Sequence, residues 1–584
     1  MDDSTPRRFA LRNREPRLML ESAALGVAGA LSAQAFMWLL HFAARLLLTG
    51  IAGYRPPGVE FGSLRASIGP HGLWLVPVVT TLGGLLSGYL VYRFAPEAEG
   101  HGTDTAVDAF HRREGIIRPR VPPIKMLASA ITIGSGGSAG REGPIALITA
   151  GVGSVYARMA HRSEEDRRIL LLAGMAAGLS AIFRTPMGTG VFAIEVLYGR
   201  MEFEVGALLY TMLASAVAYT VNGLFVGFAP LFKVPAIPTP RFSDYAAYAA
   251  LGVAAGVVGT ALPVIFYRTR DLFRTLRVPL WSKPAIGGLL LGLLAFALPQ
   301  VLGGGYGWIQ LAIDGHIALR LLVLLIFAKM AAFALTVGSG GSGGVFAPSL
   351  YVGAMLGGVF AVVLHQLPAV FVVVGMAAVF GAAARVPIAT MLMVTEMAGG
   401  YRLLVPAGLA VMIAYLLQVR LSSRLRYRSL YEGQVPTPGD SPAHYLEHIQ
   451  IALSLLGRRN LPLADKLGHL DLLRLLRSRV RFDLPGGREM TIGVIPEDSP
   501  IVGKSVGDFY SRLHNDDFEI VTIRRREHLI LPHAETLFKA GDRLVLIASQ
   551  HAREPLSHFI APVQEEHEGG VQAEASEPTQ KGAL

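Results

Sequence analysis

The segment Gly134-Ser-Gly-Gly-Ser-Ala-Gly-Arg-Glu-Gly-Pro144 returns 204 residues later as Gly338-Ser-Gly-Gly-Ser-Gly-Gly-Val-Phe-Ala-Pro348. A second set of matching residues follows each copy, in the same order and at nearly the same spacing: Arg184, Pro186, Thr189 and Glu195, then Arg385, Pro387, Thr390 and Glu396. The sequence therefore predicts an internal duplication. Gly-interrupted segments at corresponding places in two halves of a membrane protein are typical of an inverted repeat, with the binding site at its interface.

The composition around this repeat is that of a polytopic membrane protein. Of the 584 residues 52% are hydrophobic and 16% charged, whereas soluble proteins carry about 25% charged residues. Some apolar segments are shorter than the ~20 residues that span a bilayer. Broken helices at membrane depth must be buried in protein or line a polar cavity. The predicted fold class is therefore all-α, with broken, half-length helices. The apolar segments are 18–48, 73–94, 169–183, 206–228, 246–267, 285–298, 318–337, 345–364 and 403–419.

Charge and cysteine content exclude other classes. The chain has no Cys, so disulfides and cysteine-ligated metals are excluded. The net charge of +10 is carried by Arg residues beside apolar segments, which favours membrane topology over nucleic-acid binding. By the positive-inside rule both termini are expected in the cytoplasm, with the multi-pass chain in a bacterial inner (plasma) membrane. The flanking arginines are Arg7, Arg8, Arg12, Arg14 and Arg17, then Arg420, Arg424, Arg426 and Arg428.

The composition changes after the last apolar segment, which predicts a soluble C-terminal part. Strand-like runs at 490–495, 518–523, 528–531 and 543–548 predict a small α+β domain. The predicted organisation is a cytoplasmic N-terminal segment at 1–17, a membrane domain at 18–431 with halves near 18–228 and 245–431, a linker and helical connector at 432–487, the α+β domain at 488–562 and a disordered acidic tail at 563–584.

The Gly-rich segments suit a monovalent anion. Each precedes an apolar helical segment, and a helix start presents unpaired N–H groups and the positive end of the helix dipole. Such partial charges bind an anion loosely enough for it to leave again. Glycines also serve close helix packing in membranes. Because two such segments occupy duplicated positions, we favour the anion site.

These motifs resemble the signatures of the CLC family of chloride channels and chloride/proton antiporters. Gly140-Arg-Glu-Gly-Pro144 and Gly343-Gly-Val-Phe-Ala-Pro348 match two family motifs, and Gly100-His-Gly-Thr-Asp104 is similar to the first pore motif. The resemblance covers about residues 18–435. It implies a homodimer in the lipid bilayer with one anion pathway per subunit, chloride as the transported ion and no cofactor.

Site residues follow from the resemblance by motif. It implies Glu142 as the gating glutamate, whose carboxylate replaces chloride at the anion site and leaves when protonated. Burial of an acid inside a membrane protein is consistent with such a role. The resemblance implies chloride-binding positions at His101, Gly102, Arg141, Gly143, Val345, Phe346 and Tyr431, with Tyr427 as the alternate tyrosine. His101 stands where many members have Ser, and Thr103 and Asp104 depart from the family's Ile-Pro.

Residue 196 bears on the mechanism. Many family antiporters carry a proton-transferring Glu directly after the acid that matches Glu195, whereas this chain has Val196, which carries no proton. We therefore expect a gated chloride channel, dependent on voltage or pH, with chloride/proton antiport as the alternative. Glu195 is a candidate proton relay, but its counterpart Glu396 in the other half favours a structural role.

The C-terminal domain has a resemblance of its own. Residues 488–550 resemble the TrkA-C domain of bacterial ion-transport regulators, which implies a regulatory ligand of unknown identity or a passive assembly role. Fluoride or nitrate transport and a membrane-embedded enzyme are remote alternatives. The enzyme is disfavoured because the membrane segments carry neither a nucleophile with its base nor a His-Glu-x-x-His metal motif. We expect no enzymatic activity, no metal site and no nucleic-acid partner.

Overall fold

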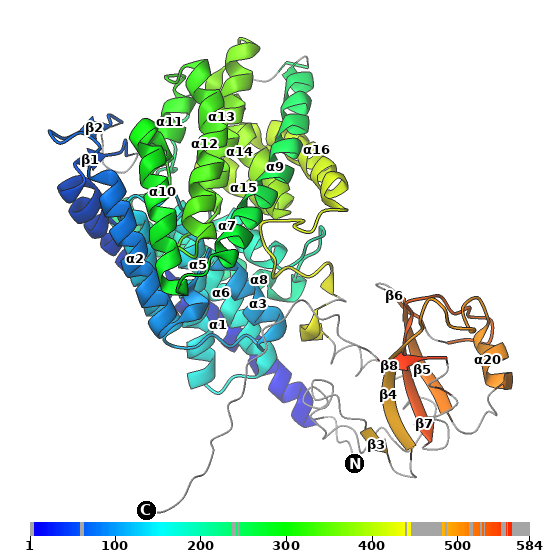
Figure 1. The fold of residues 1–584 in the computed structure, drawn as a ribbon. Helices are drawn as coiled ribbons and strands as arrows, with labels where there is room; N and C mark the ends of the chain where they lie inside the picture. The colour runs from blue at the N-terminus through cyan, green and yellow to red at the C-terminus, as the bar shows by residue number, and fades with distance from the viewer. Residues whose placement is uncertain are drawn as a thin grey trace, which may run out of the picture. The chain divides into compact units, whose positions relative to one another are not determined.

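In the computed structural model the chain forms two compact units, residues 1–443 and 444–584, each described by itself below (Figure 1). The residues that the structure describes are 5–58, 64–235, 241–242, 244–438, 441–444, 482–484, 488–512, 518–525, 528–530, 532–549, 556 and 559–562.

The first unit is helical, and its helices form two series in the same order. The first series is α1 (Thr5–Ala43, continued by a π-helical stretch Ala44–Ile51), α2 (Val76–Phe94), α3 (Thr103–Arg112), α4 (Val121–Gly134), α5 (Glu142–Met159), α6 (Glu164–Phe183), α7 (Pro186–Glu195) and α8 (Leu208–Val226). The second is α9 (Asp244–Thr275), α10 (Lys283–Ala297), α11 (Tyr306–Ile313), α12 (Leu319–Gly338), α13 (Phe346–Val363), α14 (Pro368–Ala384), α15 (Pro387–Met397) and α16 (Leu404–Ser422).

Short elements lie between these helices. They are the strands β1 (Tyr54–Arg55) and β2 (Ser67–Ile68), which pair antiparallel, and the 3₁₀ turns Pro96–Ala98, Val205–Ala207, Leu280–Ser282, Pro299–Val301, Tyr401–Leu403 and Pro442–His444.

The backbone repeats the duplication that the sequence predicts. Arg184 and Arg385, which end α6 and α14, both have left-handed φ values, 61° and 57°. His161 and His365, in the turns before those helices, both have a φ of 51°. Residues other than glycine rarely adopt this conformation, so its recurrence at matching places confirms two copies of one structural unit.

The packing places the most apolar helices inside the unit. Every residue of α14 after Pro368 is buried, and α13 packs along it as α5 packs along α6. Helices α2 and α10 run side by side (Figure 1). Among the described residues seven helices are long and apolar enough to cross a membrane: Arg14–Ile51, Val205–Val226, Asp244–Thr275, Leu280–Ala297, Leu319–Gly338, Phe346–Val363 and Tyr401–Ser422.

Two helices begin earlier in the structure than the apolar segments that predicted them. Helix α1 starts before the segment expected at 18–48, and α6 starts at Glu164 rather than at 169. The physical reason at α6 is an N-cap, because the hydroxyl of Ser163 accepts a hydrogen bond from the backbone N–H of Asp166.

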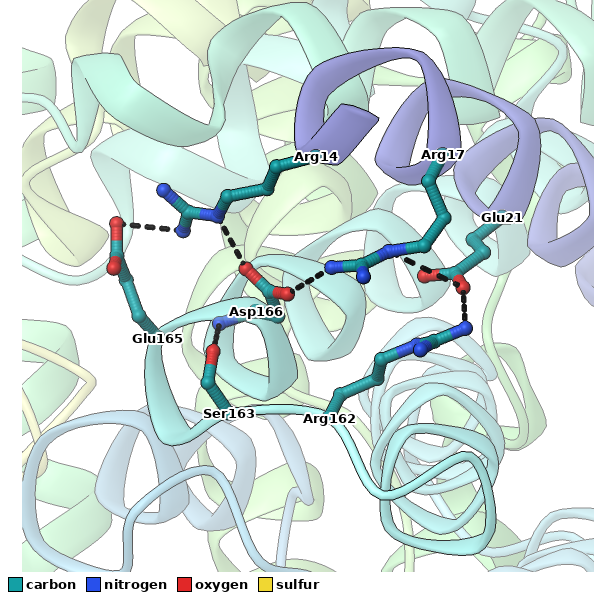
Figure 2. Close-up of polar contacts among 7 residues, drawn as sticks. All are labelled: Arg14, Arg17, Glu21, Arg162, Ser163, Glu165 and Asp166. Atoms are coloured by element: carbon teal, nitrogen blue, oxygen red, sulfur yellow. Dashed lines mark hydrogen bonds and ion pairs between the residues drawn. The ribbon is translucent and has the colours of Figure 1, made fainter. Parts of the chain in front are cut away.

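An ion-pair network ties the start of α1 to the start of α6 (Figure 2). Nε of Arg14 lies 2.7 Å from Oδ1 of Asp166, and Nη2 of Arg17 lies 2.6 Å from Oδ2 of the same carboxylate. Arg162 donates to Glu21 at 2.5 Å. Arg14 and Arg17, which the sequence assigns to membrane topology, thus also neutralise the buried acids Asp166 and Glu21.

The second unit contains a six-stranded antiparallel sheet within its described residues. The strands are β3 (Phe482–Leu484), β4 (Arg488–Val494), β5 (Phe518–Arg525), β6 (His528–Ile530), β7 (Arg543–Ser549) and β8 (Ala561–Pro562), in the order β3-β4-β7-β5-β6 with β8 beside β4, and one helix, α20 (Val506–Arg512), accompanies them. Phe509 of α20 packs against Phe518 and Phe538 in the core. The nearly fully buried Asp542 pairs with Arg525 at 2.8 Å. The predicted α+β class is confirmed, whereas the connector at 445–479 and the tail beyond 562 lie outside the described residues.

Candidate functional site: an anion pathway between two paired loops

The two Gly-rich loops contact each other directly. The N–H of Gly140 donates to the carbonyl of Gly344 at 2.7 Å, and the N–H of Gly344 donates to the carbonyl of Gly140 at 2.6 Å. This reciprocity is what a local twofold relation between the repeats produces. Helix α5 begins two residues after Gly140, and α13 begins two residues after Gly344. Two helix N-termini, each with unpaired N–H groups, therefore meet at the paired loops.

The carboxylate of Glu142 lies in this junction. A methyl group on Gly140 would be 1.8 Å from Oε2 of Glu142, and one on Gly344 would be 3.2 Å from it. Ala347, in the first turn of α13, closes the same space, because the methyl on Gly140 would be 3.1 Å from its Cβ. Glu142 is 2% exposed. Its carboxyl group thus occupies the place where two helix N-termini favour an anion.

Tyr306 covers the carboxylate from a third direction. Its hydroxyl donates to Oε1 of Glu142, and the guanidinium of Arg141 lies 4.8 Å from the centre of its ring. Tyr306 is the first residue of α11, and the N-cap before it is Gly305 with a φ of 80°. The sequence reasoning missed this residue. The available signal was position, because Gly303-Gly-Gly-Tyr306 corresponds in the repeat to Gly100-His-Gly-Thr103.

His101, in the loop before α3, lies against Tyr431, in the segment after α16. Their ring centres are 5.5 Å apart, and both side chains are buried. The side chain of Thr103, the first residue of α3, lies near the Tyr431 hydroxyl. Nδ1 of His101 has no hydrogen-bond partner within the described part of the chain. The carbonyl of His101 packs on Gly143, where an added methyl would be 1.8 Å from the oxygen, so this loop contacts the start of α5.

The remaining predicted residues divide between the junction and its surroundings. Val345 is the N-cap of α13, and the ring of Phe346 packs between Phe183 and Phe380 at 4.6 and 4.3 Å. Tyr427 instead donates to Asp271 and stacks on another tyrosine away from His101. The geometry therefore places Tyr431, and not Tyr427, beside His101.

Glu195 and Glu396 cap each other's helices. The carboxylate of Glu195 accepts from the N–H groups of Ile388 and Ala389 at 3.1 and 2.6 Å, at the start of α15. The carboxylate of Glu396 accepts from the N–H groups of residues 187 and 188 at 3.1 and 2.8 Å, at the start of α7. Val196 follows the first of these acids and is fully buried. The pair is thus an exchanged helix cap.

Two buried lysines hold the loops on either side of the junction, and the sequence reasoning missed both. Nζ of Lys125 donates to the carbonyls of Ala98 and Gly100 at 2.9 and 2.6 Å. Nζ of Lys329 donates to those of Val301 and Gly303 at 2.8 and 2.6 Å. The signal was in the sequence, because an ionisable residue within an apolar segment is a functional candidate and these two lie 204 residues apart.

A family model described as "Voltage gated chloride channel" matches residues 83–418, more than half of the chain. The chain belongs to the CLC family of voltage gated chloride channels. A second family model, the TrkA-C domain, matches residues 490–559. The family places this multi-pass membrane protein among chloride transport proteins, and it is not an enzyme.

Individual relatives agree with this membership. A putative chloride channel protein ClcB-like of Ralstonia nicotianae is 31% identical over 59% of this chain and 82% of its own. The H(+)/Cl(-) exchange transporter ClcA of Salmonella arizonae is 29% identical over 73% of this chain and 90% of its own. Two solved structures share the fold of the membrane unit. A slow cyanobacterial Cl-/H+ antiporter has a TM-score of 0.62 at 22% identity and covers 70% of this chain and 96% of its own. A CLC-type fluoride/proton antiporter has a TM-score of 0.61 at 24% identity and covers 72% and 98%.

Proposed function

We propose that this chain exchanges chloride for protons, and that Glu142 both closes the anion pathway and carries the proton. The observation that carries the proposal is the place of its carboxylate, between the Gly140–Gly344 pair and the start of α13. A carboxylate held there competes with chloride for the same partial charges. Protonation removes its charge, so that chloride takes its place.

We propose that two contacts close the pathway in series, an arrangement that favours exchange over free conduction. Glu142 and Tyr306 close one end, and the His101–Tyr431 pair closes the other. A passive pore needs one gate, whereas an exchanger must shield its ion from both sides during the cycle. We assign the anion between these closures to the N–H groups at Gly143, Val345 and Phe346, with Gly102, His101, Tyr431 and Arg141 contributing at the two ends.

The inner proton route is the point at which this chain departs from the family pattern. Val196 has no ionisable group, and both carboxylate oxygens of Glu195 accept hydrogen bonds from backbone N–H groups at the start of α15. His101 is buried beside Tyr431, and its Nδ1 has no partner among the described residues. We propose His101, with water, as the group that passes protons toward Glu142. The relatives named as H(+)/Cl(-) exchange transporters support exchange itself, and the assignment of His101 rests on its place in this structure.

A gated chloride channel is the second candidate. One observation favours it, namely the fully buried valine at residue 196, where many family antiporters have their relay acid. In this case Glu142 still acts as the gate, but no proton crosses with chloride. The sequence alone favoured this channel. The double closure and the named relatives now favour exchange.

The test is simultaneous measurement of chloride and proton movement in liposomes that contain the full chain. With the voltage clamped by potassium and valinomycin, an outward chloride gradient should drive protons inward against their own gradient. Glu142→Gln should abolish this proton movement and keep chloride flux. Glu165→Gln, at a mostly exposed acid in the first turn of α6, is the matched control and should exchange normally. If the wild type showed chloride flux without uphill proton movement, the exchange proposal would be wrong and the gated channel would be the function.

We also propose a homodimer with both termini in the cytoplasm, in a bacterial inner membrane, and a C-terminal unit that binds a regulatory ligand. The family and the TrkA-C match support these assignments. The mass of the purified protein in detergent, accessibility of added terminal tags, and flux of the full chain before and after cytosolic ligands test them in turn.

A further inference from the structure

We infer that Tyr306 is a positioning residue that holds the Glu142 carboxylate in its closed place and so sets the pH at which the pathway opens. The inference rests on the proposed role of Glu142 as the gate. It assigns a specific donor to the closed state, and that donor belongs to a different helix from the gate itself.

The contact is built into the second repeat. The Tyr306 hydroxyl donates to Oε1 of Glu142, and a residue at the first position of α11 has its place fixed by the loop before it. That loop is tightly packed, because a methyl on Gly305 would be 2.4 Å from the ring of Tyr351. Lys329 binds two carbonyls of the same stretch, at Val301 and Gly303. The phenol is therefore presented to the carboxylate by a rigid support.

The Tyr306 ring has two further neighbours. The guanidinium of Arg141 lies 4.8 Å from its centre, and the ring of Phe232 lies 6.1 Å away. The Arg141 guanidinium is attracted to the negative face of the Tyr306 ring, and this contact does not involve the hydroxyl, which donates to Glu142. Tyr306 thus contacts both Arg141 and Glu142, which are adjacent in the chain.

The donor acts on one form of the gate. A hydrogen bond to an ionised carboxylate is about twice as strong as one between neutral groups. The phenol therefore stabilises Glu142 when the acid is both deprotonated and seated, and it loses this bond when the acid leaves. Because the phenol is neutral, it does so without adding a charge that would trap chloride.

The other end of the pathway has the same arrangement. Thr103 is the first residue of α3, after Gly102 with a φ of 85°, and its side chain lies near the hydroxyl of Tyr431. Tyr306 is the first residue of α11, after Gly305 with a φ of 80°, and it bonds Glu142. At each end, the residue that begins the short helix holds the group that closes the pathway. The duplication has therefore supplied one positioning residue for each closure; we call Tyr306, the one that holds Glu142, the latch.

The test is the pH dependence of chloride flux in liposomes with the full-length Tyr306→Phe variant. Protonation opens the pathway, so flux rises as pH falls. The variant loses the hydrogen bond from the phenol to the ionised Glu142 carboxylate. Because each 1.4 kcal/mol corresponds to about one pH unit, the half-maximal pH should move upward by roughly one to two units. Tyr351→Phe is the matched control, because its hydroxyl faces the carbonyl of Gln300 at 3.4 Å, and its half-maximal pH should stay at the wild-type value.

A double variant separates the latch from the gate. In a Glu142→Ala background the change Tyr306→Phe should leave flux unaltered at every pH, because the group it holds is gone. An unchanged half-maximal pH in Tyr306→Phe, or an equal effect of this change with and without Glu142, would overturn the inference while leaving the gate intact. If Glu142→Gln kept the wild-type pH response, the gate itself and the latch would both be wrong.

Discussion

Replacing Glu195 by alanine should destabilise the protein more than the same replacement at Glu396. Each carboxylate accepts two backbone N–H groups at the start of the other repeat's helix, with distances of 3.1 and 2.6 Å for Glu195 and 3.1 and 2.8 Å for Glu396. Glu195 is fully buried, whereas Glu396 is half-buried. The two variants therefore remove the same bonds in different surroundings.

The expected cost follows from that difference. In Glu195→Ala two buried N–H groups lose their acceptor, at about 1–3 kcal/mol each, or roughly 2–6 kcal/mol together. In Glu396→Ala the start of α7 is less deeply buried, so the free energy of unfolding should fall by the cost of an ordinary helix cap, about 0.5–2 kcal/mol. Glu195→Gln keeps one acceptor oxygen and should fall between wild type and Glu195→Ala.

The assay is thermal unfolding of purified protein in detergent, followed by tryptophan fluorescence, together with coupled flux for the Gln variant. We expect the order wild type, Glu396→Ala, Glu195→Ala in decreasing apparent Tm, and normal proton coupling in Glu195→Gln. Loss of coupling in Glu195→Gln at an unchanged Tm would refute the capping role and make Glu195 the proton relay.

Other changes test the loop junction and the two units. Gly140→Ala places a methyl 1.8 Å from Oε2 of Glu142. The mobile carboxylate must then move out, and chloride flux should lose its pH dependence; a retained wild-type pH profile would contradict the described seat. Gly143→Ala places its methyl 1.8 Å from a backbone carbonyl, so a lowered Tm and little purified protein are expected, and wild-type stability would show that the loops are not in contact. Removal of 444–584, the second compact unit, should leave a folded membrane unit with chloride flux in liposomes; aggregation would show that the units fold together. Asp542→Asn weakens an ion pair with a partly exposed arginine, and about 1–3 kcal/mol of stability should be lost, read as faster limited proteolysis of the C-terminal unit.

The sequence was sufficient for the parts of the fold that its repetition encodes. The Gly-rich copies at 134–144 and 338–348 place two helix starts, and the structure begins α5 at Glu142 and α13 at Phe346. The matching acids Glu195 and Glu396 suggested a structural pair, which the exchanged caps explain in atomic terms. Repetition works as a signal because two copies that pack on each other must keep the same backbone.

The sequence was not sufficient where a contact joins segments without a shared motif. Tyr306 and Glu142 are 164 residues apart, and no spacing rule relates a phenol on one short helix to a carboxylate on another. The choice between Tyr427 and Tyr431 had the same difficulty, since both follow the last apolar segment and only the fold brings Tyr431 to His101. The valine at residue 196 removes one proton-carrying side chain, but its absence does not exclude a proton route through another residue.

The central claim is that the paired Gly-rich loops form an anion site which the Glu142 carboxylate occupies. The most direct measurement is a crystal structure of Glu142→Gln grown in bromide, with data collected at the bromine absorption edge. We predict an anomalous peak between the Gly140–Gly344 pair and the first turn of α13, where the wild-type carboxylate lies. Bromide found elsewhere in the membrane unit but absent from this junction, in a variant that still transports chloride, would contradict the claim.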